Sequence, residues 1–371
     1  MFDAPYVLLD DTIAKEARLF QNPVELFLAE SPSEAIAAFD GAQQALDRGY
    51  HVAGYASYEL GYALEEKLRA LTPAAAGLPY LVMAAFPPPR RVIIPAANKS
   101  ISISAQPRWD RDTYATAFSA VQRYIAAGDT YQINLTFPID IELSGSPWDL
   151  YLDRRTRQPT CFGGVVDIAG PKVISFSPEL FFRIDGGLIR ARPMKGTAPR
   201  GNTPDEDAQI AAMLSRDIKQ RAENLMIVDL LRNDIGRISE TGSVRVPDLF
   251  TVETYPTLHT MVSGIEGRLK PGLSMLDVFA ALFPCGSVTG APKVRAMEII
   301  AELEPWQRGA YCGAVGVFSP DGSALFNVAI RTLTVLDTTR AIYSVGGGLV
   351  ADSIAEAEYD ECLLKAKFLL G

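Results

Sequence analysis

The sequence predicts an α+β fold with large antiparallel β-sheets. Two β-hairpins can be followed directly, each with apolar and β-branched arms that meet at a Gly-containing turn. Segments with apolar residues at helical spacing precede and follow these hairpins in the sequence. Because strands and helices do not alternate regularly, the pattern excludes a parallel, doubly wound sheet.

The sequence pattern of residues 1–90 predicts a small α/β lobe. Within it, residues 33–46 have helical spacing, and residues 51–59 are typical of a strand. Pro87, Pro88 and Pro89 open a stiff connection, so we expect a boundary at 87–107 and a larger core over 107–371. We expect the lobe to pack on the core, giving one structural unit.

Several helices are expected in the core. Asp110 is a suitable N-cap for a helix in which Tyr114, Phe118 and Val121 follow helical spacing. Pro292 suits the first turn of another helix, and Ser353 and Glu356 have capping-box spacing. The later helices are expected at 204–232, 274–282, 291–303 and 353–370.

The first core hairpin places a lysine near a carboxylate. Its arms are Val173–Ser177 with Leu180–Ile184, and Leu188–Arg192, joined by a turn at 185–187. This register sets Glu179 opposite residue 193 or 194, so Lys195 is within reach of its carboxyl group. Such a pair suits a nucleophilic amine and an acid that protonates a leaving hydroxyl. A solvated ion pair would produce the same pattern.

The second hairpin turns at Pro320-Asp321-Gly322 and sets Tyr311 opposite Arg331. An arginine on an otherwise apolar strand needs an anionic partner. That partner is either a bound anion or a structural carboxylate.

The C-terminal segment offers backbone donors and carboxylates. Gly346, Gly347 and Gly348 precede the last helix, where bare N–H groups suit an anion, although a Gly triplet is also typical of a tight turn. On that helix Glu358 and Glu361 share a face, and Glu223 lies in a second helix. One or two such carboxylates suit Mg²⁺; an ion pair of Glu361 with Lys365 is the alternative.

Composition excludes several classes of protein. The 371 residues carry a net charge of −9, which argues against a nucleic acid as the main partner. The four cysteines are far apart and do not form a zinc or disulfide pattern. We find no signal peptide and no apolar run that could span a membrane, and we expect a cytoplasmic protein.

Five segments together resemble the chorismate-utilising family, over roughly residues 110–371. The family includes anthranilate, isochorismate, salicylate and aminodeoxychorismate synthases. The segments follow the family's order and spacing, and they are 195–197, 222–234, 289–297, 313–316 and 346–361. The resemblance implies a sandwich of large antiparallel sheets with helices on the outside. The resemblance is weaker over the N-terminal lobe, which is shorter than is usual in the family.

Three positions separate the branches of this family. Lys195 stands where anthranilate and isochorismate synthases usually have a small residue and aminodeoxychorismate synthases a lysine. Gln132 replaces the lysine base of the water-adding enzymes, and Thr260 replaces the histidine that anthranilate synthases use to eliminate pyruvate, with His259 one position early. All three favour a transferase that makes 4-amino-4-deoxychorismate from chorismate and ammonia, a precursor of p-aminobenzoate and folate.

The resemblance also implies a role for each residue. Lys195 would add to C2 of the ring while Glu179 protonates the leaving hydroxyl at C4. Glu223 and Glu361 would bind Mg²⁺, with Glu358 assisting. The residues implied in substrate binding are Gly196, Thr197, Thr289, Tyr311, Arg331, Gly346, Gly347, Gly348 and Lys365.

Ammonia is expected from a partner. Neither His51 nor His259 lies in a recognisable glutamine amidotransferase segment, so we expect a heterodimer with a separate amidotransferase subunit and a lyase acting downstream. The alternatives are an anthranilate synthase component I and a catalytically silent chorismate-binding subunit. The presence of all the implied catalytic residues argues against the silent subunit.

Overall fold

Two large antiparallel sheets and the helices around them form the fold. The computed structural model describes residues 2–73, 78–157, 159–255 and 258–370. The first sheet, sheet A, has the order β16-β8-β20-β19-β10-β9-β1-β2-β6, with β7 also paired to β8. The second, sheet B, has the order β13-β15-β12-β11-β18-β17-β4-β5-β3, with β14 also paired to β15. This is the α+β class that the sequence predicts.

The strands of sheet A are β1 Tyr6–Asp11, β2 Glu16–Gln21, β6 Arg90–Val92, β7 Ile103–Pro107, β8 Gln132–Leu143, β9 Phe162–Asp167, β10 Lys172–Ser177, β16 Gly290–Ala291, β19 Thr332–Val335 and β20 Arg340–Leu349. Those of sheet B are β3 Glu25–Ala29, β4 His51–Ala56, β5 Leu81–Phe86, β11 Leu180–Asp185, β12 Leu188–Arg192, β13 Met194–Pro199, β14 Arg245–Thr254, β15 Leu258–Arg268, β17 Ala314–Phe318 and β18 Ala324–Val328.

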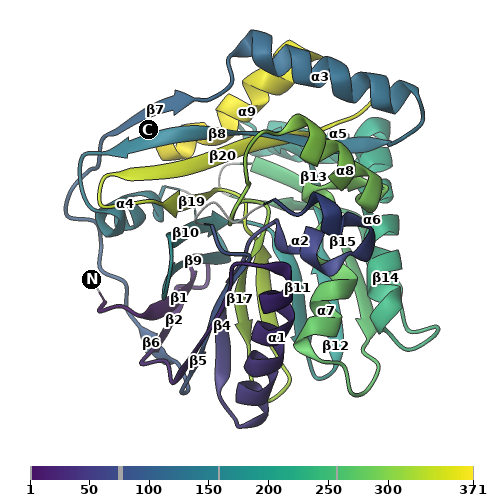
Figure 1. Ribbon diagram of the computed structural model, residues 1–371. Helices are drawn as coiled ribbons and strands as arrows, with labels where there is room; N and C mark the ends of the chain where they lie inside the picture. The colour runs from purple at the N-terminus through teal and green to yellow at the C-terminus, as the bar shows by residue number, and fades with distance from the viewer. Residues whose placement is uncertain (1, 74–77, 158, 256–257, 371) are drawn as a thin grey trace.

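The helices are α1 Pro32–Asp47, α2 Leu60–Leu64, η1 Glu66–Leu71, α3 Arg111–Ala126, α4 Pro147–Arg154, α5 Pro204–Arg216, α6 Ile218–Ile238, α7 Met275–Leu282, η2 Gly286–Val288, α8 Lys293–Leu303 and α9 Ala355–Leu370. In Figure 1, α3 and α9 lie together along one side of the molecule, and α1, α6 and α7 lie along another. None of the helices in the described ranges has the length and apolar character that a bilayer crossing requires.

Most of the helix predictions are confirmed. Asp110 caps α3 by accepting a hydrogen bond from the Thr113 amide, and α1 and α7 cover the predicted ranges. The helix predicted over 204–232 is instead two helices, because Asp217 has an extended backbone and its side chain caps α6. This break separates the surface helix α5 from α6, which carries Glu223.

Two capping predictions are wrong. Pro292 is the N-cap of α8 and does not lie in its first turn. Ser353 and Glu356 do not form a capping box: the Ser353 hydroxyl donates to Glu358 instead, at 2.7 Å. That bond holds one of the candidate metal ligands.

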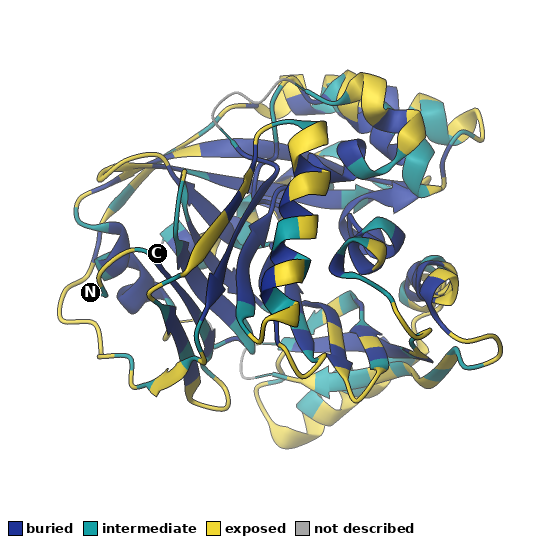
Figure 2. Ribbon diagram, turned by 60° about the horizontal axis from the view of Figure 1, so that its bottom comes forward, coloured by how far each residue is buried: buried dark blue, intermediate teal, exposed yellow. Residues whose placement is uncertain are grey.

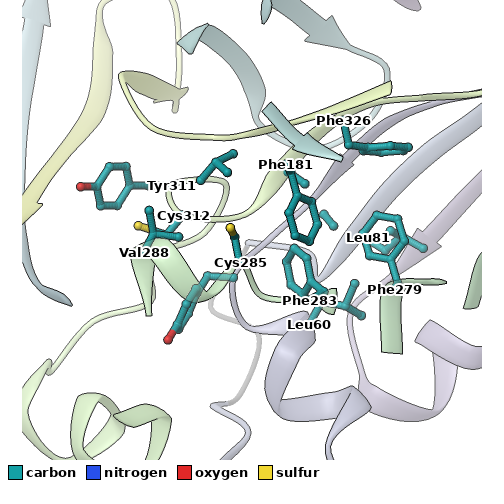
Figure 3. Close-up of a cluster of buried hydrophobic side chains, with 14 of the residues drawn as sticks. Leu60, Leu81, Phe181, Phe279, Phe283, Cys285, Val288, Tyr311, Cys312 and Phe326 are labelled. Carbon is teal, nitrogen blue, oxygen red and sulfur yellow. The ribbon is translucent and has the colours of Figure 1, made fainter. Parts of the chain in front are cut away.

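Both sheets contribute to the core. One cluster, which includes Val7 and Phe20 from sheet A and Val82 and Phe86 from sheet B, fills the space between the sheets. A larger cluster continues under the helices, whose outer faces are exposed (Figure 2). Figure 3 shows part of this larger cluster, with Phe181 and Phe283 close to Cys285, and with Val288 on the far side of Cys285 beside Tyr311 and Cys312. The apolar core thus extends to the wall of the candidate site.

The first 90 residues are interleaved with the rest of the chain. They provide β1, β2 and β6 to sheet A and β3, β4 and β5 to sheet B. Strand β1 pairs with β9, and β4 pairs with β17. The division into a lobe over 1–90 and a core over 107–371 stays a prediction.

Candidate active site

A cavity of about 440 Å³ lies where the two sheets meet α6, η2 and α9. This volume is within the range of small-molecule sites. The cavity brings together most of the residues that the sequence predicts for catalysis, substrate binding and metal binding. Those that line it are Glu179, Lys195, Gly196, Thr197, Glu223, Tyr311, Arg331, Gly346, Gly348, Glu358, Glu361 and Lys365.

Glu179 and Arg331 reach the cavity because the chain changes sheets at both places. The predicted first arm of the hairpin is in fact two strands: β10 lies in sheet A and β11 in sheet B, and Glu179 is in the crossover between them. The chain returns from β18 to β19 through Arg331. The crossovers lie side by side, because the Val328 amide donates to the Glu179 carbonyl and the Phe176 amide donates to the Arg331 carbonyl, each at 3.0 Å.

Arg331 is a cation without an anionic partner in the described part of the chain. It has a positive φ of 52°, and its guanidinium lies 5.9 Å from the centre of the Phe368 ring. Burial lowers the pKa of the guanidinium, with smaller opposing contributions from Tyr343 and Glu179. No structural carboxylate forms an ion pair with it, so the cavity offers its charge to a bound anion.

Lys195 reaches the cavity from a β-bulge. Met194 pairs with Val262 but Thr197 pairs with Thr260, so β13 has one extra residue at Lys195-Gly196. Gly196 has a φ of +84°, and a Cβ there would lie 2.8 Å from the Gln220 side chain. Glycine is required because the backbone is left-handed and α6 approaches closely. The bulge turns Lys195 toward the cavity.

Ser287 joins Lys195 to Glu179. Its hydroxyl donates to Glu179 Oε1 at 2.8 Å, and its carbonyl accepts a hydrogen bond from Lys195 Nζ at 3.3 Å. The two charged groups that the sequence predicts to meet are therefore bridged by a third residue. Burial raises the pKa of Glu179 and lowers the pKa of Lys195. Both shifts favour a protonated acid beside a neutral amine.

Three carboxylates also line the cavity. Glu223 comes from α6, and Glu358 and Glu361 come from α9. Burial raises the pKa of Glu223 and of Glu358. Burial also acts to raise the pKa of Glu361, but Lys365 at 2.9 Å outweighs it and holds this pKa below its usual value.

These carboxylates suit a hard cation. Within the described ranges, no three His, Cys, Asp or Glu side chains are close enough together to form a complete metal cage. Mg²⁺ does not need one, because it takes one or two protein carboxylates and completes its shell with water and substrate oxygens. One or two of the carboxylates of Glu223, Glu358 and Glu361 therefore supply the kind of oxygen ligand that Mg²⁺ takes.

The Gly triplet is neither a turn nor a helix N-terminus. It lies within strand β20, where Gly346, Gly347 and Gly348 pair with Thr136, Leu135 and Asn134 of β8. Gly346 and Gly348 face the cavity, and the Gly346 carbonyl accepts a hydrogen bond from Lys365 at 2.9 Å. A Cβ on Gly348 would lie 3.4 Å from Lys195 Nζ. The absence of a side chain on Gly348 leaves room for Lys195.

Two predicted residues do not line the cavity. Thr289 is fully buried, and its hydroxyl donates to the Cys285 carbonyl at 2.9 Å. Gly347 faces α9, where a Cβ would lie 3.0 Å from Glu358 Oε2. Both stand behind the wall and support residues that form it.

The other two branch-specific positions lie next to Lys195. The Thr260 hydroxyl donates to the Gly196 carbonyl at 3.2 Å and so supports the bulge. Gln132 is fully buried, and its amide has no hydrogen-bond partner among the described residues. A Cβ on Gly348 would lie 3.0 Å from the Gln132 nitrogen, so this amide is adjacent to the cavity wall.

Sequence reasoning missed Ser287 and Lys219, both of which line the cavity. Ser287 stands two residues before the 289–297 segment, and this proximity was the available signal. Lys219 stands four residues before Glu223, one helical turn away. Its significance depends on contacts that only the fold creates.

Comparison with known proteins agrees with this geometry. A family model described as chorismate binding enzyme matches residues 93–371. Aminodeoxychorismate synthase component 1 of Escherichia coli (strain K12) is 44% identical over 276 residues, which cover 74% of this chain and 61% of that protein. The Salmonella typhimurium protein of the same name is 46% identical over 268 residues, covering 71% and 58%.

The chain thus spans about three fifths of the length of these curated relatives. A solved structure, anthranilate synthase component I from Streptococcus pneumoniae, superposes with a TM-score of 0.83 at 26% identity and covers 100% of this chain and 93% of that one. The family model matches most of the chain, and both sheets and the cavity fall within the shared fold. The chain therefore belongs to the chorismate binding enzyme family.

Proposed function

We propose that this chain is a synthase subunit that converts chorismate and ammonia to 4-amino-4-deoxychorismate in the cytoplasm. The observation that carries the proposal is the contact of Ser287 with both Lys195 and Glu179 on the cavity wall. A lysine at this position, where anthranilate synthases usually have a small residue, favours amination at C4. The name that these two curated relatives share supports the same assignment.

Substrate binding would rely on the cations and the backbone of the cavity. Arg331 offers an unpaired guanidinium to one carboxylate of chorismate, and the buried Tyr311 borders the same space. Lys365, the Gly346 and Gly348 backbone, and the Gly196-Thr197 segment would orient the rest of the molecule. Because the sheets, their connections and α9 hold these groups, they would supply much of the catalysis through positioning.

Glu223 and Glu361, with Glu358 assisting, would hold Mg²⁺ in the cavity. The ion would neutralise the ring carboxylate and fix the orientation of the ring. The role of the chain here is to set the separation of α6 and α9, which carry these carboxylates.

The chemistry would proceed in two displacements. In the first, Lys195 Nζ bonds to C2, both ring double bonds shift, and the C4 hydroxyl leaves as water with the proton of Glu179. In the second, ammonia bonds to C4, the double bonds shift back, the C2–N bond to Lys195 breaks, and the proton that the new amine loses returns to Glu179. The sum is chorismate plus ammonia giving 4-amino-4-deoxychorismate plus water. Thr260, which lacks the basicity of histidine, fits a product that keeps its enolpyruvyl group.

A separate glutamine amidotransferase would supply the ammonia, since the chain has no recognisable glutaminase segment. A lyase would then act on the product to release p-aminobenzoate.

The test is product identification with purified chain, chorismate, Mg²⁺ and an ammonium salt. We expect 4-amino-4-deoxychorismate, which becomes p-aminobenzoate only when a lyase is added. Fluorescent anthranilate formed without a lyase would assign the chain to the anthranilate synthases. Binding of chorismate without any turnover would make it a silent binding subunit.

A further inference from the structure

An ion pair beside the cavity joins the first turn of α6 to the segment before α9, the two helices that carry the carboxylates. Lys219 Nζ, in the first turn of α6, lies 2.8 Å from Asp352 Oδ2, in the segment before α9. Lys219 itself lines the cavity. Each charge shifts the pKa of the other: the hydrogen bond to Asp352 raises that of Lys219, and the same bond lowers that of Asp352.

The position of Lys219 is unfavourable for the helix itself. The first turn of a helix carries the positive end of the macrodipole, which repels a lysine. The nearby carboxylate of Asp217, the N-cap of α6, accepts a hydrogen bond from the Gln220 amide. The ion pair with Asp352 offsets the unfavourable position of Lys219, with smaller contributions from Glu223 and Glu358.

Each side of this ion pair is connected to a candidate metal ligand. Glu223 stands one turn after Lys219 on α6. On the other side, Asp352 precedes Ser353, whose hydroxyl accepts from the Val350 amide at 3.1 Å and donates to Glu358 Oε1 at 2.7 Å. The ion pair thus ties Glu223 to Glu358, which are far apart in the sequence.

We propose that Lys219 and Asp352 are positioning residues that set the distance between the carboxylates of α6 and α9 and so strengthen the binding of a divalent cation. The inference rests on the metal site of the proposed function. It adds a structural tie to that site, between residues that are not ligands.

The direction in which Lys219→Ala changes the affinity for the metal distinguishes a positioning role from a purely electrostatic effect. Lys219 is a cation near the carboxylates, so if charge alone mattered, Lys219→Ala would tighten metal binding. If the ion pair positions the carboxylates, the same substitution weakens metal binding. Both side chains are more than half exposed, so the expected effect is modest, about two- to five-fold in the dissociation constant.

The experiment titrates the full chain, without chorismate, with Mn²⁺ by electron paramagnetic resonance and with Mg²⁺ as the competitor. We expect weaker binding in Lys219→Ala and in Asp352→Ala, and recovery in the swapped Lys219→Asp/Asp352→Lys protein, which keeps the net charge. Lys99→Ala is the matched control: it removes a similarly exposed lysine from the ion pair with Asp149. Thermal unfolding of each variant verifies that the fold is retained.

The outcomes are distinct. Unchanged or tighter binding in Lys219→Ala, or failure of the swapped protein to recover, overturns the positioning role while leaving the metal site intact. If the unaltered chain binds no Mn²⁺, or if binding survives Glu223→Gln and Glu361→Gln, the metal site of the proposed function is wrong and the inference falls with it.

Discussion

Ser287 contacts both Glu179 and Lys195 on the wall of the cavity: its hydroxyl donates to Glu179 Oε1 at 2.8 Å and its carbonyl accepts from Lys195 Nζ at 3.3 Å. Because Oε1 accepts this hydrogen bond, a proton on Glu179 is directed to Oε2. The same residue also orients the amine. One short segment, η2, therefore aligns the proposed acid and the proposed nucleophile.

Substitution of Ser287 is expected to shift the pH dependence of the reaction. The hydrogen bond from Ser287 stabilises the charged form of Glu179 and lowers its pKa, so Ser287→Ala raises this pKa further. The limb of the pH profile of kcat/KM that belongs to Glu179 moves up by about one pH unit or less. The other charged or titratable groups near Glu179 are Lys195, Arg331, Cys285 and Cys312.

Since Ser287→Ala keeps the backbone carbonyl, the limb set by Lys195 is expected to stay in place. Ser287→Thr keeps the hydroxyl and serves as the control that restores the original profile. A profile in which both limbs move together, or neither moves, contradicts this role.

Lys195→Ala is expected to abolish amination at C4. The covalent route requires the amine, and its loss costs about 10²-fold or more in kcat, a magnitude typical of groups that move protons or bonds in the transition state. Product analysis by chromatography is the measurement. Addition at C2 in place of C4 would agree with the proposal, whereas full retention of the 4-amino product would show that no adduct forms.

Glu223→Gln and Glu361→Gln are expected to raise the Mg²⁺ concentration needed for half-maximal activity by about ten-fold or more, because each removes a charged ligand. Activity at a series of Mg²⁺ concentrations is the measurement. Glu356→Gln, on the same helix but exposed and outside the cavity lining, is the control. Equal effects of all three substitutions would argue against a local metal site.

Loss of one partner of a buried ion pair behind the site is expected to lower the free energy of unfolding strongly. Arg308 and Glu304 are both almost fully buried and joined at 2.8 Å, and Arg308 also donates to the carbonyls of Val288 and Asn134. Arg308→Met leaves Glu304 buried and unpaired, so the free energy of unfolding falls by about 3–5 kcal/mol. Urea denaturation measures this change.

The double variant Glu304→Leu/Arg308→Met removes both charges and is expected to be more stable than Arg308→Met alone. A double variant that is no more stable than the single one would show that the hydrogen bonds of Arg308, and not the unpaired charge, dominate. Both variants also test whether Val288, next to Ser287, needs this support for activity.

Local patterns predicted the elements that depend on neighbouring residues. The register of the β11–β12 hairpin, the caps of α3 and α7, and the helical face that carries Glu358 and Glu361 all follow from residues within a few positions of each other. Turn residues, caps and helical spacing act over such distances, and the sequence therefore specifies them.

Other features depended on distant pairing. Gly346–Gly348 became a strand because β8 was available to pair with it, and the 204–232 helix is broken at Asp217, where α6 begins. The two crossovers between sheets bring Glu179 beside Arg331, and the bulge at Lys195 follows from the register of β13 against β15.

The sequence by itself therefore determined which residues we propose to carry the chemistry: Lys195, Glu179, the carboxylates and the branch-specific Gln132 and Thr260. Only the tertiary structure decided how they meet: Ser287 contacts both Lys195 and Glu179, and the Lys219–Asp352 ion pair joins α6 to the segment before α9. The physical reason is that residue identity is local, whereas these contacts form only when strands and helices far apart in the sequence pack together.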